Sequence, residues 1–330
     1  TDRQQPGEYR LEERSDEALF GYNLGPRSWK QYLFPPSLRL FAARRAGSGY
    51  EIEPHGEAPP DLAFIGIRPC EIAGIDVQDR VFTGGAHVDP WFAAVRERAF
   101  LVAVQCGQAA ATCFCTSMST GPRAERGFDL ALTELLEDGE HLFFVEVGSS
   151  RGGDVLAALH PSPATPADRA RAEAATRRAE SQMSRSIDGE GLPELLERSL
   201  EHPRWAEVAE RCLSCANCTM VCPTCFCHTV EDVNDLAGDR TERWRQWDSC
   251  FTGEHAYIHG GDVRPSTRGR YRQWLTHKFG TWHAQFGTSG CVGCGRCIAW
   301  CPVGIDVTEE IAALQVEPDA PAAAETEEAT

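Results

Sequence analysis

Two stretches of the chain carry cysteines at one repeated spacing that suits iron–sulfur chemistry. Each follows the order C-x2-C-x2-C-x3-C-P; the first runs from Cys212 to Pro223 and the second from Cys291 to Pro302. A cubane cluster needs four thiolates at tetrahedral positions around a compact core, and a tight C-x2-C-x2-C loop supplies three of them. Glycines in the second stretch leave room for backbone N–H groups to approach the sulfurs. The spacing therefore predicts two [4Fe-4S] clusters.

The fourth cysteine of each stretch precedes a proline and begins a helix that points away from its own loop, so it ligates the neighbouring cluster. We therefore expect the two ligand sets to interlock. The first cluster takes Cys212, Cys215, Cys218 and Cys301, and the second takes Cys291, Cys294, Cys297 and Cys222. Full cysteine ligation leaves no iron open to a substrate, so the expected role is the conduction of single electrons.

Zinc is the alternative of another class, because structural zinc sites also use thiolates in C-x2-C pairs. A zinc-binding structural scaffold would explain the pairs. It rarely needs three closely spaced cysteines plus a fourth before proline, and this chain has that arrangement twice. The repeated spacing favours the clusters.

Four further cysteines fall in the first third of the chain: Cys70, Cys106, Cys113 and Cys115. Cys106 ends an expected strand and Cys70 lies just past another, and ligands bind at strand ends in α/β sheets. The C-x-C loop that follows has no packing rationale. The four thiols therefore predict a third cluster, although Cys70 and Cys106 would also suit the role of small buried apolar side chains.

The remaining cysteines are Cys225, Cys227 and Cys250. With His228 or Asp248 they would supply enough ligands for a further metal site. Spare thiols that pack against the first cluster explain them equally well, and the spacing leaves both readings open. His255 and His259 stand four residues apart, but no third ligand is evident, so we expect surface or core histidines there.

In the N-terminal part, alternating strand and helix signals indicate the scaffold that would hold Cys70, Cys106, Cys113 and Cys115. Leu62–Arg68 and Ala99–Cys106 are short apolar runs of the kind that form buried strands. Between them, Asp89-Pro90 is an N-cap followed by proline, which predicts a helix over Trp91–Arg98. Strand, helix and strand in this order indicate a parallel crossover. Leu142–Val147 is a third expected strand, after the turn signal Asp138-Gly139.

The expected fold class is α+β, with an N-terminal α/β domain followed by a mainly helical domain of bacterial dicluster ferredoxin type. The α/β domain, which holds the third site, covers 1–160, and a helical connector covers 161–204. The dicluster domain covers 205–316 with a long insert, 228–290, and residues 317–330 form a disordered acidic tail.

Helix signals also continue through and beyond the connector. Ala167–Met183 is rich in Ala, Arg and Glu and predicts an exposed connecting helix, whereas Pro193–Leu200 and Trp205–Cys212 predict amphipathic helices. Within the insert, basic residues gather in a stretch whose acidic partner is Asp262 alone. They would offset anionic clusters or dock an acidic partner, or simply form a solvated helix face. They are Arg264, Arg268, Arg270, Arg272 and Lys278.

Length and charge exclude several classes of protein. The 330 residues suffice for about two domains, and 32 basic against 49 acidic residues give a net charge of −17, which argues against nucleic-acid binding. No apolar run approaches the roughly 18–20 residues that a membrane span needs. The polar N-terminal stretch predicts no signal peptide, so the expected location is the cytoplasm. Clustered cysteines in a reducing compartment indicate metal or redox chemistry.

Several motifs together resemble one family. Gly66–Ala73, Cys113–Pro122 and Gly127–Glu134, with the two cysteine stretches, resemble the beta subunits of cytoplasmic sulfhydrogenases, which are bidirectional NAD(P)-linked [NiFe] hydrogenases. The A subunit of anaerobic sulfite reductase is similar. The resemblance runs from about Leu33 to Ile311.

The resemblance implies a non-catalytic electron-transfer subunit of an oxidoreductase complex. Its partners would be a flavin/NAD(P)-binding subunit and the small and large subunits of a [NiFe] hydrogenase, and it would relay electrons between these modules. The alternative within the family is a subunit that feeds a sirohaem protein. By position, the resemblance implies that the eight dicluster cysteines are cluster ligands. It also makes the four N-terminal cysteines stronger candidates for ligands of a third cluster, so one or two clusters beyond the first two are expected. A free ferredoxin-like carrier is disfavoured by the length of the chain.

Overall fold

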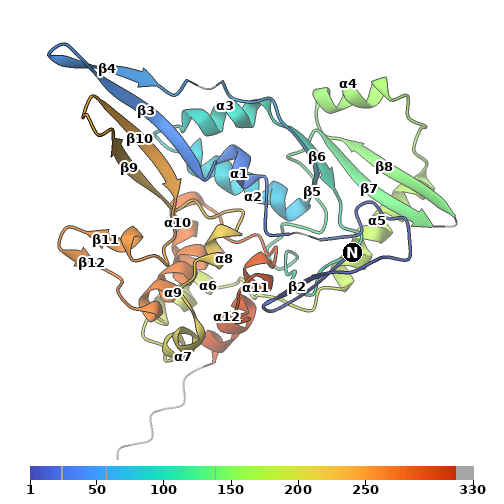
Figure 1. The fold of residues 1–330 in the computed structure, drawn as a ribbon. Coiled ribbons are helices and arrows are strands. Elements are labelled where there is room, and N and C mark those ends of the chain that lie inside the picture. Colours follow the sequence, from blue (N-terminus) through green and yellow to red (C-terminus); the bar gives the residue numbers. More distant parts are fainter. Residues whose placement is uncertain (24, 57, 138, 317–330) are drawn as a thin grey trace, which may run out of the picture.

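The computed structural model describes residues 1–23, 25–56, 58–137 and 139–316 (Figure 1). The expected acidic tail, 317–330, lies outside the described residues, and so does Asp138 of the expected turn. The chain folds into sheets and helices, as the α+β class requires. Within the described part, no helix is long and apolar enough to cross a membrane.

A four-stranded sheet with the order β5-β6-β7-β8 forms the centre of the N-terminal part. Its strands are β5 (Ala63–Ile67), β6 (Phe100–Val104), β7 (Leu130–Glu137) and β8 (Glu140–Val147). β5 and β6 pair in parallel, which confirms the expected crossover, while β7 is parallel to β6 and antiparallel to β8. The three predicted strands correspond to β5, β6 and β8, and β7 was not predicted.

The crossover contains two helices, of which only the second was predicted. α2 (Pro69–Phe82) follows β5 directly, and α3 (Pro90–Arg98) precedes β6. The Asp89 carboxylate accepts a hydrogen bond from the Phe92 N–H (2.8 Å), as an N-cap followed by proline predicts. Phe92 and Val95 of α3 are fully buried in the core beneath the sheet.

Helix α5 (Pro166–Ser181) corrects the expectation of an exposed connector, and α4 (Ser150–Ala158) precedes it. Ala172, Ala175 and Ala179 are almost completely buried, and the helix packs on β7 and β8. Alanine side chains are short enough to let a helix axis approach a sheet closely. The expectation was wrong because alanine contributes little to an apolar stripe in the sequence, although a row of alanines is well suited to close packing.

A second four-stranded sheet joins distant parts of the sequence. Its order is β4-β3-β10-β9, all antiparallel, and Figure 1 shows it projecting at the upper left, away from β5–β8. β3 (Ser37–Ala46) and β4 (Gly49–Pro54) come from the N-terminal part, whereas β9 (His228–Asn234) and β10 (Arg240–Trp247) come from the insert. The N-terminal part and the insert therefore share one sheet.

The remaining helices pack below the sheets in the view of Figure 1 and surround the two cysteine motifs. Trp205, Leu275, Phe279 and Ile311 are fully buried in their shared core. The helices are α6 (Leu192–Arg198), α7 (Arg204–Arg211), α8 (Asn217–Met220), α9 (Thr267–Thr276), α10 (Trp282–Phe286), α11 (Arg296–Ala299) and α12 (Val307–Gln315). α6 and α7 confirm the two predicted amphipathic helices.

Short elements complete the fold. They are β1 (Asp2–Gln5), β2 (Glu8–Leu11), α1 (Lys30–Leu33), a 3-10 turn (Glu254–Ala256), β11 (Tyr257–Ile258), β12 (Gly261–Asp262) and a π-helical turn (His277–Thr281) between α9 and α10. The β1–β2 hairpin lies against the second cysteine motif, because the Gly7 N–H donates to the Ile298 carbonyl (3.0 Å) and Tyr9 stacks on Trp300.

Candidate iron–sulfur centres

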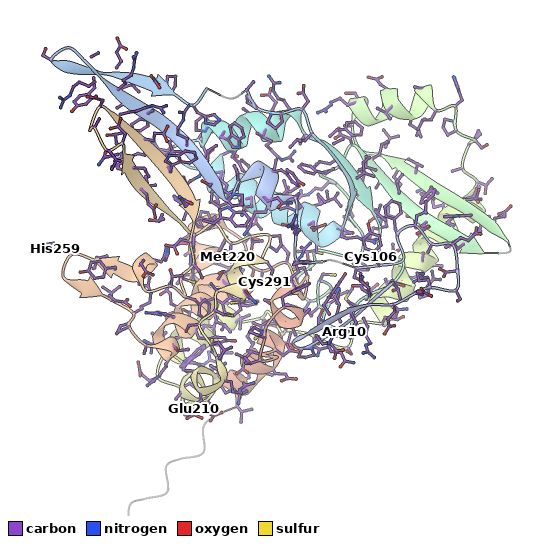
Figure 2. All side chains as sticks on the ribbon, viewed as in Figure 1. Arg10, Cys106, Glu210, Met220, His259 and Cys291 are labelled. Atoms are coloured by element: carbon purple, nitrogen blue, oxygen red, sulfur yellow. The ribbon has the colours of Figure 1, made fainter. Side chains whose placement is uncertain are left out.

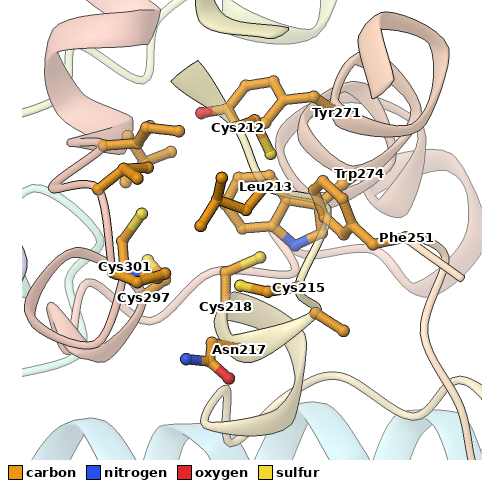
Figure 3. Close-up of a pocket in the computed structure, with 15 residues that line it drawn as sticks. Cys212, Leu213, Cys215, Asn217, Cys218, Phe251, Tyr271, Trp274, Cys297 and Cys301 are labelled. Atoms are coloured by element: carbon orange, nitrogen blue, oxygen red, sulfur yellow. The ribbon is translucent and has the colours of Figure 1, made fainter. Parts of the chain in front are cut away.

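The first four cysteines of the interlocked prediction line one pocket. Figure 3 shows the sulfurs of Cys212, Cys215, Cys218 and Cys301 around this space, with Cys297 beside Cys301. Cys212 and Cys215 come from the loop that leads into α8, Cys218 lies in α8, and Cys301 follows α11. Most of the other lining residues are apolar or aromatic: Leu213, Phe251, Tyr271, Trp274, Ile305 and Val307. The first group of thiols therefore surrounds a space whose remaining wall is apolar and has a low dielectric constant.

The two motifs repeat the same backbone conformation. Ser214 and Ala216 of the first motif have φ of 50° and 66°, and Gly293 and Gly295 at the matching positions have φ of 62° and 74°. The Ser214 N–H points to the Cys212 sulfur (N···S 3.5 Å), and the Gly293 N–H points to the Cys291 sulfur (3.4 Å). Backbone donors that approach sulfur are the arrangement that the glycines of the second motif predicted.

The second group contains Cys291, Cys294, Cys297 and Cys222. Burial and then the neighbouring sulfurs of Cys291, Cys294 and Cys222 raise the pKa of Cys297 well above its ordinary value. The Thr224 hydroxyl donates to the Gly290 carbonyl (2.6 Å) and holds the end of the first motif against the start of the second. The structure thus brings Cys222 to the second motif and Cys301 to the first.

The four N-terminal cysteines form a third group. Cys70 lies in the first turn of α2, Cys106 follows β6, and Cys113 and Cys115 lie in the next loop. Burial, followed by the nearby Cys106 sulfur, raises the pKa of Cys113 to about 12. Burial and the sulfurs of Cys294, Cys115 and Cys106 likewise raise the pKa of Cys70. The strand ends therefore bring these thiols together.

The third group is fastened directly to the second. The Phe114 N–H, between Cys113 and Cys115, donates to the Gly293 carbonyl (2.9 Å), and the Thr120 hydroxyl donates to the Val292 carbonyl (2.7 Å). Cys294 is the shared neighbour, since it packs in one buried cluster with Cys70 and Cys115. Cys297 of the second group in turn lines the pocket of the first group. The three groups form a row with the second in the middle.

Buried cations lie between the thiols, although the sequence gives no sign of their burial. Lys278 is 4% exposed, and its ammonium donates to the Cys222 sulfur (3.3 Å) and the Gly290 carbonyl (3.0 Å). Lys30 is 3% exposed, donates to the Cys225 carbonyl (3.3 Å) and lies 4.0 Å from the centre of the Trp247 ring. Among the described residues, neither ammonium pairs with a carboxylate.

Uncompensated ammonium groups in a protein interior cost several kcal/mol in lost hydration. A thiolate-ligated cluster is anionic and would supply the missing countercharge. Burial disfavours the charged form of Lys278, yet the Cys222, Cys225 and Cys291 sulfurs together raise its pKa well above the ordinary value. Arg296, 1% exposed, pairs with Glu71 (2.7 Å) between the second and third groups. The residues around these thiols therefore fit negatively charged iron–sulfur clusters.

Three of the other basic residues in this stretch of the insert have structural partners. Arg270 pairs with Asp262 (2.7 Å), and Arg268 and Arg272 both reach Glu201 (3.1 Å each). Only Lys278 of this stretch faces a sulfur of the three groups in the described structure. The expected compensation of cluster charge therefore falls on Lys278, while these arginines hold the helical part together.

The last predicted group contains Cys225, Cys227 and Cys250, of which Cys250 packs against the same core as Cys212 and Cys218. Cys225 is buried, and the neighbouring Cys222 raises the pKa of its thiol, whereas Cys250 and His255 lower the pKa of Cys227. His228 is exposed, and its Nδ1 contacts the Phe226 carbonyl (3.0 Å). Among the described residues, no group of three or more His, Cys, Asp or Glu side chains is arranged to hold a single metal ion. A further metal site at these cysteines stays a prediction.

His255 is a contact that the sequence reasoning missed. The Asp248 carboxylate, one of the two candidates for completing a further metal site, lies 3.2 Å from the His255 Nδ1. His259, four residues further on, is exposed at the tip of the β11–β12 hairpin, as expected of a surface histidine (Figure 2). The sequence signal that could have indicated this contact is that His255 follows shortly after Cys250.

Comparison with known proteins agrees with this arrangement. Residues 211–305 match the 4Fe-4S dicluster domain family. The chain is 31% identical over 304 residues to sulfhydrogenase 2 subunit beta of Pyrococcus furiosus, an alignment that covers 90% of this chain and 86% of the relative. No solved structure matches the chain. On the strength of this near full-length match and of the dicluster domain, the chain belongs to the sulfhydrogenase beta-subunit family.

Proposed function

We propose that the chain relays single electrons between a [NiFe] hydrogenase module and a flavin/NAD(P) module. The family and the dicluster domain make it an iron–sulfur electron-transfer subunit. The proposal rests on the row of three thiol groups, in which Cys294 packs with Cys70 and Cys115 of the third group and Cys297 lines the pocket of the first. Such a row offers a continuous route across the molecule.

We further propose how the cysteines divide among the clusters. Cys212, Cys215, Cys218 and Cys301 hold the first [4Fe-4S] cluster, and Cys291, Cys294, Cys297 and Cys222 hold the second. Cys70, Cys106, Cys113 and Cys115 hold a third cluster. When bound, each cluster accepts and donates one electron at a time. The chain itself excludes water through its apolar walls, directs backbone N–H groups to sulfur and compensates the negative charge with Lys278, Lys30 and Arg296.

The proposed partners are a flavin/NAD(P)-binding subunit and the small and large subunits of a [NiFe] hydrogenase. The proposed location is the cytoplasm, where these partners and reduced thiols coexist. Support comes from the relative, whose name makes it one subunit of a sulfhydrogenase.

Iron analysis of protein purified without oxygen tests the proposal. We expect about 12 irons per chain for three cubanes, and at least about eight for the two of the dicluster domain. Nickel and flavin should co-purify with the native assembly. A colourless, zinc-loaded chain with fewer than about eight irons would overturn the proposal, and sirohaem in place of nickel would assign the chain to a sulfite reductase instead.

Replacing Lys278 with methionine should lower the reduction potential of the second cluster. Loss of one buried positive charge next to the Cys222 sulfur is worth about 0.1 V, from one unit charge at several ångströms in an effective dielectric constant of about 20. A redox titration followed by electron paramagnetic resonance measures the shift. Arg268→Gln, which removes an exposed charge from the same basic stretch, is the control and should leave the potential unchanged. Equal potentials in Lys278→Met and wild type would contradict the assignment.

A further inference from the structure

Two buried side chains beside the first group of thiols carry a polar hydrogen that has no acceptor. The Tyr271 hydroxyl and the Trp274 indole N–H are shielded from solvent, and neither has a hydrogen-bond partner among the described residues. Tyr271 is 3% exposed and Trp274 is 5% exposed. A buried polar group without a partner costs free energy, so most such groups in proteins are paired. Two of them side by side indicate an acceptor other than the described protein atoms.

Both side chains border the space that the first four thiols surround. They line one pocket together with Cys212, Cys215, Cys218 and Cys301. Figure 3 shows the Trp274 indole reaching into this space and the Tyr271 ring extending past Cys212. Asn217 is the other polar side chain of this wall besides the cysteines, and its amide already donates to the Trp300 carbonyl (3.3 Å). The two unpaired donors therefore belong to a wall whose other polar groups are mainly thiols.

Helix α9 carries the two donors on one face. They stand three residues apart, which places them on the same side of a helix, and their ring centres are 5.4 Å apart. The Phe251 ring packs against both, with its centre 6.2 Å from that of Tyr271 and 5.9 Å from that of Trp274. Close packing of buried rings restricts their rotation. The polar hydrogens therefore stay at the wall of the pocket.

The same helix is tied to the first cysteine motif. Ser214 lies within the first C-x2-C loop, and its hydroxyl donates to the Thr267 hydroxyl (3.0 Å) in the first turn of α9. The Ser266 hydroxyl accepts a hydrogen bond from the Gly269 N–H (3.1 Å) and so caps the start of the helix. These contacts fix α9, and with it the two donors, relative to the loop that carries the thiols.

We propose that Tyr271 and Trp274 donate hydrogen bonds to sulfur in the first iron–sulfur centre and raise its reduction potential. The proposal rests on the proposed function in one respect, namely that the first group of thiols holds a cluster. Hydrogen bonds to sulfur are among the factors that set the potential of such a cluster. Reduction adds negative charge to the acceptor, and a hydrogen bond to a more highly charged acceptor is stronger. The two donors therefore stabilise the reduced form more than the oxidised form.

Water is the competing acceptor for the two donors. A buried water typically makes about three hydrogen bonds to polar groups, whereas most of this wall is apolar or consists of thiols. The second group of thiols has a charged neighbour instead, because the Lys278 ammonium donates to the Cys222 sulfur (3.3 Å). The two centres of the dicluster domain are thus tuned by different means, the first by neutral donors and the second by a buried charge.

The test uses the full chain, purified without oxygen, in the variants Tyr271→Phe and Trp274→Phe. A redox titration followed by electron paramagnetic resonance should show that each variant lowers the potential of one cluster and keeps the iron content of the wild type. We expect Tyr271→Phe to lower the equilibrium constant for reduction about tenfold, which is about 59 mV for a one-electron couple. Tyr257→Phe is the matched control, because it removes the same hydroxyl from a side chain that is 65% exposed, and it should leave every potential unchanged.

Comparison with Lys278→Met identifies the cluster that responds. Lys278 lies beside the second group, so the midpoint that falls in Tyr271→Phe should differ from the one that falls in Lys278→Met. Wild-type potentials in both phenylalanine variants at full iron content overturn the proposal, and so does a fall of the same midpoint as in Lys278→Met. If one variant loses iron, the potentials of the other decide. Fewer than about eight irons in the wild type overturn the proposed function itself, on which this proposal rests.

Discussion

Replacing Cys294 with alanine should remove about four irons per chain, one cubane, and stop electron flow through the subunit. Cys294 belongs to the second group and also neighbours Cys70 and Cys115 of the third, so its loss interrupts the row at its middle. Iron analysis measures the first effect. Hydrogen-dependent reduction of NAD(P) by the assembled complex measures the second, while direct dye reduction by the partner's own hydrogen-activating site should continue.

Cys225→Ala provides the comparison for this variant. Cys225 is also buried and also lies near the second group, because the Cys222 sulfur acts on the pKa of its thiol, but it belongs to none of the three proposed clusters. This control should keep the iron content and the electron transfer of the wild type. A Cys294→Ala protein that retains both properties would show that the ligand assignment is wrong.

Gly293→Ala should destabilise the protein by about 3 kcal/mol, because a strained conformation and a backbone collision add together. Gly293 has φ of 62°, and an added Cβ would lie 2.6 Å from both the Cys115 Cα and the Phe114 carbonyl oxygen. Neither contact belongs to a flexible side chain, so the loop that carries Cys113 and Cys115 must move away. We expect loss of iron from the second and third clusters, together with a lower temperature of thermal unfolding without oxygen.

Gly238→Ala separates strain from collision. Gly238 has a similar φ of 72°, but an added Cβ would meet nothing within 4 Å. This variant should lose only about 1 kcal/mol from the left-handed conformation and keep all its iron. If the two variants unfold at the same temperature with the same iron content, close contact between the second motif and the third group is unimportant.

The local features of this fold could be predicted from the sequence, because they depend on residues that are close in the chain. The cysteine spacing indicated the dicluster domain, and Asp89-Pro90 located the start of α3. Strand ends also indicated correctly that Cys70 and Cys106 would lie near the C-x-C loop. In each case one short segment contains the determining interactions.

Features that depend on contacts across the chain could not be predicted. β3 and β10 pair over a large sequence separation, and both are rich in charged residues that disguise their strand character. Lys30, Lys278 and Arg296 are ordinarily surface residue types, and only the folded chain shows that they are buried beside sulfur. His255 lies near Cys227 because the antiparallel pairing of β9 and β10 brings the segment after β10 back beside the start of β9.

The placement of Cys301 beside the first motif constrains how the protein can be made. Cys212, Cys215 and Cys218 leave the ribosome long before Cys301, which lines the same pocket but follows α11 in the sequence. The nascent polypeptide therefore presents an unfinished coordination sphere throughout translation of the insert. Under the proposed ligand assignment, iron delivery to either paired centre must wait until α11 has been translated, and synthesis that stops before α11 would yield a product unable to mature either of them.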